Sequence, residues 1–145
     1  MKRHLLLGVL ACALAACATN PAQRDAERLA LYLAHAGEPV TSFRYSGSLN
    51  GWTPLGEDAV ALWTRPSQAY LVSFKGRCPD LDFAPAISVS SQLNTVYKNF
   101  DKVTALTPGS MSIPCHIREI RPLDVKAIRQ AEREMRANAK VSERP

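Results

Sequence analysis

Residues 58–74 read Asp-Ala-Val-Ala-Leu-Trp-Thr-Arg-Pro-Ser-Gln-Ala-Tyr-Leu-Val-Ser-Phe, and the rest of the chain is best understood around them. Two apolar runs flank the short connection Arg65-Pro66-Ser67. In the second run Tyr70, Val72 and Phe74 share one parity, which is the period-two spacing of a β-strand. The pattern predicts a β-hairpin, and its high apolar content places both strands in the middle of a sheet.

Further short strands are predicted on both sides of this hairpin. Residues 94–97 and 100–106 are expected to pair with each other around Lys98-Asn99. Ile117 and Ile120 differ in parity, which predicts a bulge or a strand that is buried on both faces. The expected strands outside the hairpin are 40–45, 52–55, 86–91, 94–97, 100–106 and 115–121.

A helix is predicted at each end of this β-rich region. Asn20 can cap a first helix, which Gly37 and Pro39 stop. Asp124 can cap a second helix, whose apolar stripe is Val125, Ile128, Ala131 and Met135. The sequence therefore predicts an α+β fold: a curled antiparallel β-sheet or small β-barrel of about six strands, flanked by an N-terminal and a C-terminal helix.

Length and composition set limits on the class of protein. The chain has 145 residues, of which 46% are hydrophobic and 21% charged, with a net charge of +5. These values fit one globular domain and exclude a disordered chain, a large multidomain enzyme and a polytopic membrane protein. The basic excess is mild, and the sequence contains no recognisable nucleic-acid-binding module, so no nucleic-acid partner is expected.

The N-terminus carries an export signal. Lys2 and Arg3 precede an uncharged run, 5–16, that is too short to span a bilayer. Leu14-Ala15-Ala16-Cys17 resembles the bacterial lipoprotein signal motif, in which the cysteine is acylated, palmitate included, after cleavage in front of it. The alternative is an ordinary signal peptide cut near Ala16, and Cys12 is a weaker lipidation candidate.

The resemblance also implies where the protein resides. In such lipoproteins an aspartate directly after the cysteine retains the protein at the inner membrane, and here Ala18 follows Cys17. We therefore expect a lipid anchor in the outer membrane with the protein facing the periplasm. The expected regions are 1–16 (signal peptide), 17–37 (lipidated Cys17 and first helix), 38–124 (β domain) and 125–145 (amphipathic helix and polar tail).

Two cysteines remain after Cys12 is removed and Cys17 is lipidated. Cys78 and Cys115 form an even pair in an oxidising compartment, which predicts a disulfide. The alternative is a metal pair completed by His116, but the chain has no CxxC or HxxxH partner for it. No metal and no cofactor are therefore expected.

Candidate catalytic residues are few. The chain has no Gly-x-Ser-x-Gly elbow, no HExxH and no phosphate-binding glycine loop. Asp80 and Asp82 could face the same way in an extended segment and act with a histidine, or they could simply build a turn. His35 falls at a helix end, where a capping role is expected.

Trp52, Arg44 and Arg65 are the best candidates for a partner-binding surface, because tryptophan and arginine dominate binding hot spots. Trp52 is flanked by Gly51 and Pro54, and we expect it to be the more exposed tryptophan. Trp63 is expected in the core.

Three segments together resemble a family of small bacterial exported proteins whose function is unknown. These are 61–72 with Trp63 and Pro66, 78–84 from Cys78 to Ala84, and 115–124 from Cys115 to Asp124. The resemblance implies export and a common fold but brings no activity. We therefore expect a periplasm-facing lipoprotein that acts as a non-enzymatic binding or envelope-accessory module, with an envelope protein or glycan as its partner. The alternative is a small envelope hydrolase that uses Asp80 or Asp82 with a histidine.

Overall fold

The computed structural model describes residues 20–142. The predicted signal peptide and Cys17 lie outside these residues. The elements in chain order are helix α1 (Pro21–Ala34), strands β1 (Ser42–Arg44), β2 (Gly51–Pro54), β3 (Ala59–Arg65) and β4 (Gln68–Phe74), the 3-10 helix η1 (Leu81–Phe83), strands β5 (Ala86–Val89), β6 (Thr95–Tyr97), β7 (Lys102–Leu106) and β8 (Pro114–Pro122), and helix α2 (Val125–Ser142).

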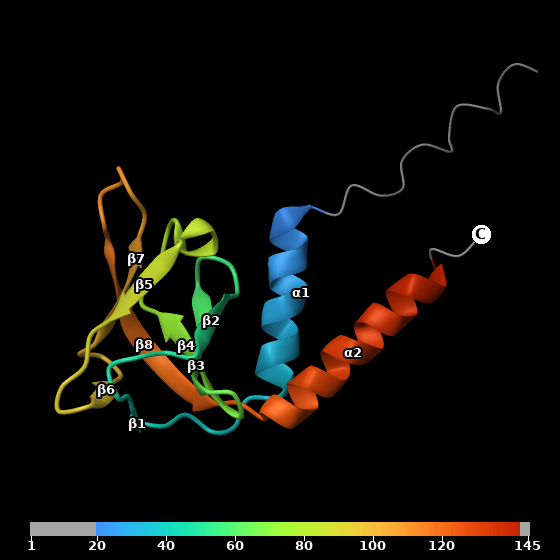
Figure 1. Cartoon of the computed structure of the whole chain (residues 1–145), viewed down its shortest axis with the longest axis horizontal. Helices are drawn as coiled ribbons and strands as arrows, with labels where there is room; N and C mark the ends of the chain where they lie inside the picture. The colour runs from blue at the N-terminus through green and yellow to red at the C-terminus, as the bar shows by residue number, and fades with distance from the viewer. Residues whose placement is uncertain (1–19, 143–145) are drawn as a thin grey trace, which may run out of the picture.

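Six strands form one antiparallel sheet in the order β2-β3-β4-β8-β7-β5 (Figure 1). The hairpin predicted from residues 58–74 is β3–β4, in which Val60 lies opposite Val72 and Leu62 opposite Tyr70. The last strand, β8, pairs with β4 on one side and β7 on the other, so it lies in the middle of the sheet. The sheet curls into a half-barrel, with one helix before it and one after it in the chain, which confirms the predicted α+β fold.

A bulge in β8 resolves the parity of its two isoleucines. Ser73 lies opposite Glu119 and Phe74 opposite Ile117, so Arg118 is an extra residue in β8. The extra residue returns Ile120 to the same face as Ile117, and both side chains are fully buried. The predicted irregularity is therefore present.

The concave face of the sheet holds the larger core. Strands β1 and β6 pair with each other and cover this face, where Phe43 of β1 stacks on Tyr70 with ring centroids 4.5 Å apart. Cys78 and Cys115 lie in this core at disulfide distance, with their sulfur atoms 1.98 Å apart, as the cysteine count predicts.

The predicted pairing of 94–97 with 100–106 is wrong. Strand β6 pairs with β1, whereas β7 pairs with β5 and β8. The physical reason is a tight turn at Asp101, whose buried carboxylate accepts hydrogen bonds from the Tyr97 N–H (2.7 Å) and the Ser90 hydroxyl (2.6 Å). The Asp101 N–H also donates to the Tyr97 carbonyl (3.0 Å), and the Asp101 carbonyl accepts from the Ile117 N–H (3.0 Å). The turn at residues 97–101 therefore directs β7 onto β8 rather than back along β6.

The convex face is covered by α1 and the first turns of α2. Buried Tyr32 of α1 and Ile128 of α2 pack there against Leu71. The predicted caps are present: the Asn20 side chain accepts from the Ala22 N–H (3.1 Å), and the Asp124 carboxylate accepts from the Ala127 N–H (3.0 Å).

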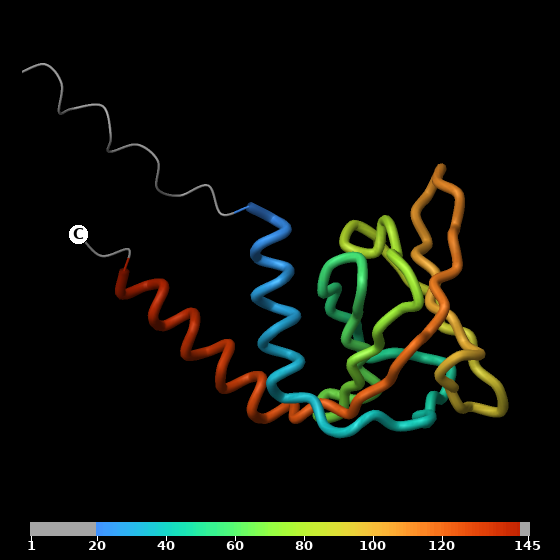
Figure 2. The backbone as a smooth tube through the Cα atoms, turned by 180° about the vertical axis from the view of Figure 1, so that it is seen from behind, coloured from blue at the N-terminus to red at the C-terminus, as the bar shows by residue number. Residues whose placement is uncertain are grey.

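Helix α2 keeps only the start of its predicted apolar stripe buried. Val125 and Ile128 are buried, but Met135 is 52% exposed. Figure 2 shows the reason, because α2 diverges from α1 and leaves the body of the molecule after its first turns.

Candidate functional site

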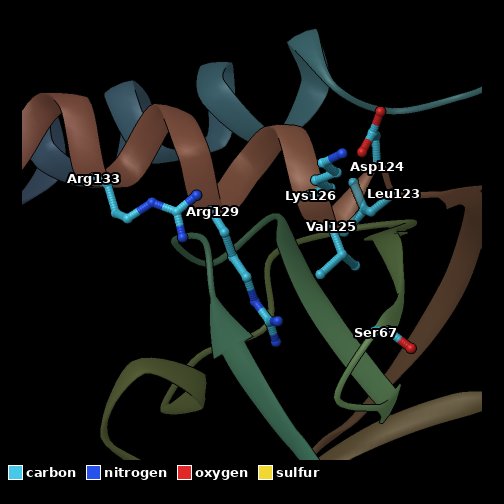
Figure 3. Close-up of a pocket in the computed structure, with 7 residues that line it drawn as sticks. All are labelled: Ser67, Leu123, Asp124, Val125, Lys126, Arg129 and Arg133. Atoms are coloured by element: carbon cyan, nitrogen blue, oxygen red, sulfur yellow. The ribbon is translucent and has the colours of Figure 1, made fainter.

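A basic pocket lies where the first turns of α2 meet the β3–β4 turn (Figure 3). The cavity has a volume of about 450 Å³, within the range of small-ligand sites. It is lined by Ser67, Leu123, Asp124, Val125, Lys126, Arg129 and Arg133.

Three cations in this pocket come from one face of α2. Lys126, Arg129 and Arg133 follow one another at spacings of three and four residues, which places them on adjacent turns of a helix. The one carboxylate of the pocket, Asp124, already accepts the Ala127 N–H as the helix cap. Within residues 20–142, neither Lys126 nor Arg133 forms an ion pair or a side-chain hydrogen bond, so the pocket has an uncompensated positive charge.

Arg129 fixes this end of α2 on the sheet. Its guanidinium lies over the Trp63 ring, 5.6 Å from the centroid, and donates a hydrogen bond to the Pro66 carbonyl. The Trp63 indole in turn donates to the Thr53 hydroxyl (3.0 Å). The pocket wall is therefore tied to β2, β3 and the β3–β4 turn.

An acidic cleft lies beside the N-terminal half of α1. Its volume is about 420 Å³, and it contains the carboxylates Asp25, Glu57, Asp58 and Asp82 together with Arg77, which pairs with Glu57. Burial raises the pKa of Asp82 above its usual value, and the charges of Asp25 and Glu57 raise it further. Asp82 therefore keeps its proton to a higher pH than an ordinary aspartate.

The expectation that Asp80 and Asp82 share a face of an extended segment is wrong. Asp80 has a left-handed backbone (φ 64°) and directly precedes η1, in which Asp82 lies. The Asp80 carboxylate accepts from the Ser110 hydroxyl (3.4 Å), whereas Asp82 belongs to the acidic cleft. Asp80 is a turn residue, which was the alternative to a catalytic role for this pair.

Neither histidine within residues 20–142 lines the acidic cleft that contains Asp82. His35 is the C-cap of α1, and Asp25 lies ten residues earlier in the same chain segment, a helical rise of about 15 Å. His116 is exposed on β8 opposite Lys102. Among residues 20–142, no group of three or more histidine, cysteine or acidic side chains is arranged to hold a metal ion.

The predicted surface of Arg44, Trp52 and Arg65 is not assembled around an exposed tryptophan. Trp52 lies in β2 opposite Leu62 and packs against the concave-face core, and it is half-buried, as Trp63 is, so neither tryptophan is fully exposed. Arg44 and Arg65 are exposed at the ends of β1 and β3. The indole turns inward because β2 pairs with β3 in a register that gives Trp52 the parity of the core residue Leu62.

Comparison with known proteins assigns the family. Residues 1–139 match the Family of unknown function (DUF6491). The chain belongs to this family. No curated protein and no solved structure matches it.

For this DUF6491 member, the basic pocket is the feature that sequence reasoning missed. The excess of arginine and lysine in the last 28 residues is visible in the sequence, and their spacing puts Lys126, Arg129 and Arg133 on one helix face. The β3–β4 turn that closes the pocket lies about 60 residues earlier in the chain, so nothing local to α2 predicts it.

None of the helices within residues 20–142 is long and apolar enough for a membrane crossing.

Proposed function

We propose that the protein is a lipoprotein of the outer membrane, anchored through Cys17 and facing the periplasm. The support is the order of features in the sequence: the positive Lys2-Arg3, the uncharged run, and Leu14-Ala15-Ala16 before Cys17. The pairing of Cys78 with Cys115 fits an oxidising compartment outside the cytosol.

We further propose that it acts as a non-enzymatic binding module for an anionic glycan of the envelope, held in the basic pocket. The observation that carries this proposal is the set of three cations, Lys126, Arg129 and Arg133, around a cavity whose one carboxylate is committed to a helix cap. Carboxylate or phosphate groups on a glycan are complementary to this charge.

The anchor is tested by the Cys17→Ser variant of the full chain, followed in cell fractions and by labelling with radioactive palmitate. The wild type should carry label and sediment with the outer membrane, and the variant should lose both properties. Continued sedimentation of the variant with membranes would contradict anchoring at Cys17. The Cys12→Ser variant is the matched control, because it should behave as the wild type.

The binding role is tested by sedimentation with isolated peptidoglycan sacculi at low and high salt. The double variant Lys126→Ala with Arg133→Ala should lower the bound fraction several-fold, and salt should weaken binding of the wild type. Both residues are exposed, so the fold should persist. Arg44→Ala is the control for a general effect of charge: equal loss in this variant would assign binding to the whole basic surface and contradict a role for the pocket.

The alternative is a small envelope hydrolase that uses Asp80 or Asp82 with a histidine. One observation supports it, the raised pKa of Asp82 in the acidic cleft, which suits a general acid. We place it second because neither His35 nor His116 lines the cleft that holds this carboxylate. Release of soluble fragments from sacculi by the wild type, lost in Asp82→Asn but kept in Asp80→Asn, would favour the hydrolase.

A further inference from the structure

The chain exposes four large apolar side chains in two segments that lie far apart in the sequence. Phe83 of η1 is 87% exposed, and Leu106, Met111 and Ile113 of β7 and the β7–β8 connection are 42%, 84% and 51% exposed. We call these four residues the apolar rim. Exposed apolar clusters on a folded domain mark a surface that contacts another apolar phase or a partner.

Two contacts bring the halves of the rim together. The Ser110 hydroxyl donates to the Asp80 carboxylate (3.4 Å), which joins the β7–β8 connection to the turn before η1. Ala86, three residues after Phe83, lies opposite Leu106 in the β5–β7 pair. In Figures 1 and 2 η1 and the β7–β8 connection both lie along the upper edge of the molecule.

The same edge contains the first turn of α1. Phe83 lines the acidic cleft together with Pro21 and Ala22, so the rim adjoins the residues at which the described chain begins. Cys17 precedes Pro21 by four residues, a distance of at most about 14 Å along a fully extended chain. A lipid attached to Cys17 therefore holds this edge close to the membrane surface.

We propose that the apolar rim lies on the phospholipid bilayer, where Phe83 and Met111 enter the interfacial region and orient the domain. This inference rests on the proposed lipidation of Cys17. A bilayer fits the rim better than a protein partner does, because the chain length before Pro21 already places a lipid surface next to it. Phenylalanine and methionine are side chains that partition well into the boundary between headgroups and acyl chains.

Charges near the rim are compatible with this contact. The carboxylates beside Phe83 would be repelled by anionic lipid, but Glu57 is paired with Arg77. Arg28 lowers the pKa of Asp82 against the dominant effect of burial, so a second cation is close to the remaining carboxylates. The acidic cleft is therefore partly neutralised where it adjoins the rim.

The contact would give the basic pocket a defined direction. The Asp124 N–H donates to the carbonyl of His35, the C-cap of α1, so the pocket lies at the C-terminal end of that helix. Helix α1 has 14 residues and a length of about 21 Å. If the rim lies on the bilayer at the N-terminal end of α1, the basic pocket at the C-terminal end of α1 faces the periplasm.

The test places a photoreactive benzophenone amino acid at position 83, 111 or 93 of the full chain in cells whose phospholipids carry radioactive phosphate. Leu93 is the matched control, because it is also apolar and 95% exposed but belongs to the β5–β6 connection at the opposite end of the sheet (Figures 1 and 2). Retention of the Cys78–Cys115 bond, seen by gel mobility without reductant, shows that each variant is folded. Palmitate labelling of the same samples reports the anchor separately.

We expect radioactive lipid adducts at positions 83 and 111 at a yield several-fold above that at position 93. Protein adducts without lipid adducts at positions 83 and 111 would overturn the inference in favour of a protein partner. Equal yields at the three positions, or no lipid adduct at any of them, would overturn the bilayer contact of the rim. Palmitate labelling of the same samples would then show that the anchor at Cys17 still stands. Absence of palmitate from folded protein would overturn the anchor and, with it, this inference.

Discussion

The two faces of the central sheet are both buried, but side chains of different size bury them. On β3 the concave face receives Val60 and Leu62, whereas the convex face receives Ala59 and Ala61. Large side chains of β3 fill the space between the sheet and the β1–β6 pair. Over the two alanines the space is filled from other elements, by Tyr32 of α1 and Ile128 of α2. Residues 59–62 therefore alternate in side-chain volume rather than in polarity, because both faces of the strand are buried there.

The faces also differ in how they are held. The concave core contains the Cys78–Cys115 pair, while the convex core depends on helix packing and on polar contacts at its margin. We expect the concave core to be the more rigid and the more costly to disrupt. Four predictions test this difference, beginning with the largest effect.

Removal of the disulfide should have the largest effect. In the double variant Cys78→Ala with Cys115→Ala, the free energy of unfolding should fall by about 4 kcal/mol, because the bond closes a loop of 37 residues in the unfolded chain. Urea unfolding measures the change, with the wild type in reductant as the matched sample. A loss below about 1 kcal/mol would show that the concave core does not depend on this bond.

Equivalent truncations in the two cores should differ. Ile120→Ala in the concave core should cost about 3 kcal/mol, and Ile128→Ala in the convex core about 2 kcal/mol, because α2 can shift to fill part of the cavity. Both side chains are fully buried, so exposure does not distinguish them. Val141→Ala, at an exposed site, is the control. The reverse order of the two losses would contradict a more rigid concave core.

Loss of the Arg129 side chain should loosen the convex face. Arg129→Ala removes the contact with the Trp63 ring and the hydrogen bond to Pro66, and should lower the free energy of unfolding by about 1 kcal/mol. Trp63 fluorescence should change along with it, and Trp52 should be unaffected. Arg136→Ala removes only an exposed pair with Glu132 and should cost less than about 0.5 kcal/mol. Equal effects would show that Arg129 does not hold α2.

Tyr32 should give the smallest effect and a specific pH dependence. Burial, and then the charge of Glu132, raises the pKa of Tyr32 above 10.0, so the folded protein holds this proton more firmly than the unfolded chain does. Stability should therefore fall as the pH rises above 10. Tyr32→Phe removes the hydrogen bond to Glu132 (3.3 Å), costs less than about 1 kcal/mol at pH 7, and should flatten this decline.

The control for this titration is Tyr45→Phe, since burial alone, without a nearby carboxylate, raises the pKa of Tyr45. Stability measured between pH 8 and pH 11 compares the two variants. An unchanged alkaline decline in Tyr32→Phe would assign the decline to other groups.

The candidate site was much less accessible to sequence reasoning than the fold. The caps at Asn20 and Asp124 and the bulge near Ile117 were predictable, because each depends on residues within a few positions. The inward direction of Trp52 was not, since it depends on the register between β2 and β3 and on how β1 covers the concave face. The residues around Trp52, from Gly51 to Pro54, do not indicate that register.

The type and order of the elements, from the first helix through the β3–β4 hairpin to the last helix, followed from periodicity, capping residues and turns. These signals are local, so the chain carries them in any environment. The pairing of β6 with β1, the place of β8 at the centre of the sheet and the assembly of the basic pocket emerged only in the folded molecule. Each joins segments that are distant in sequence, and the choice among possible partners depends on burying both faces of one sheet at once.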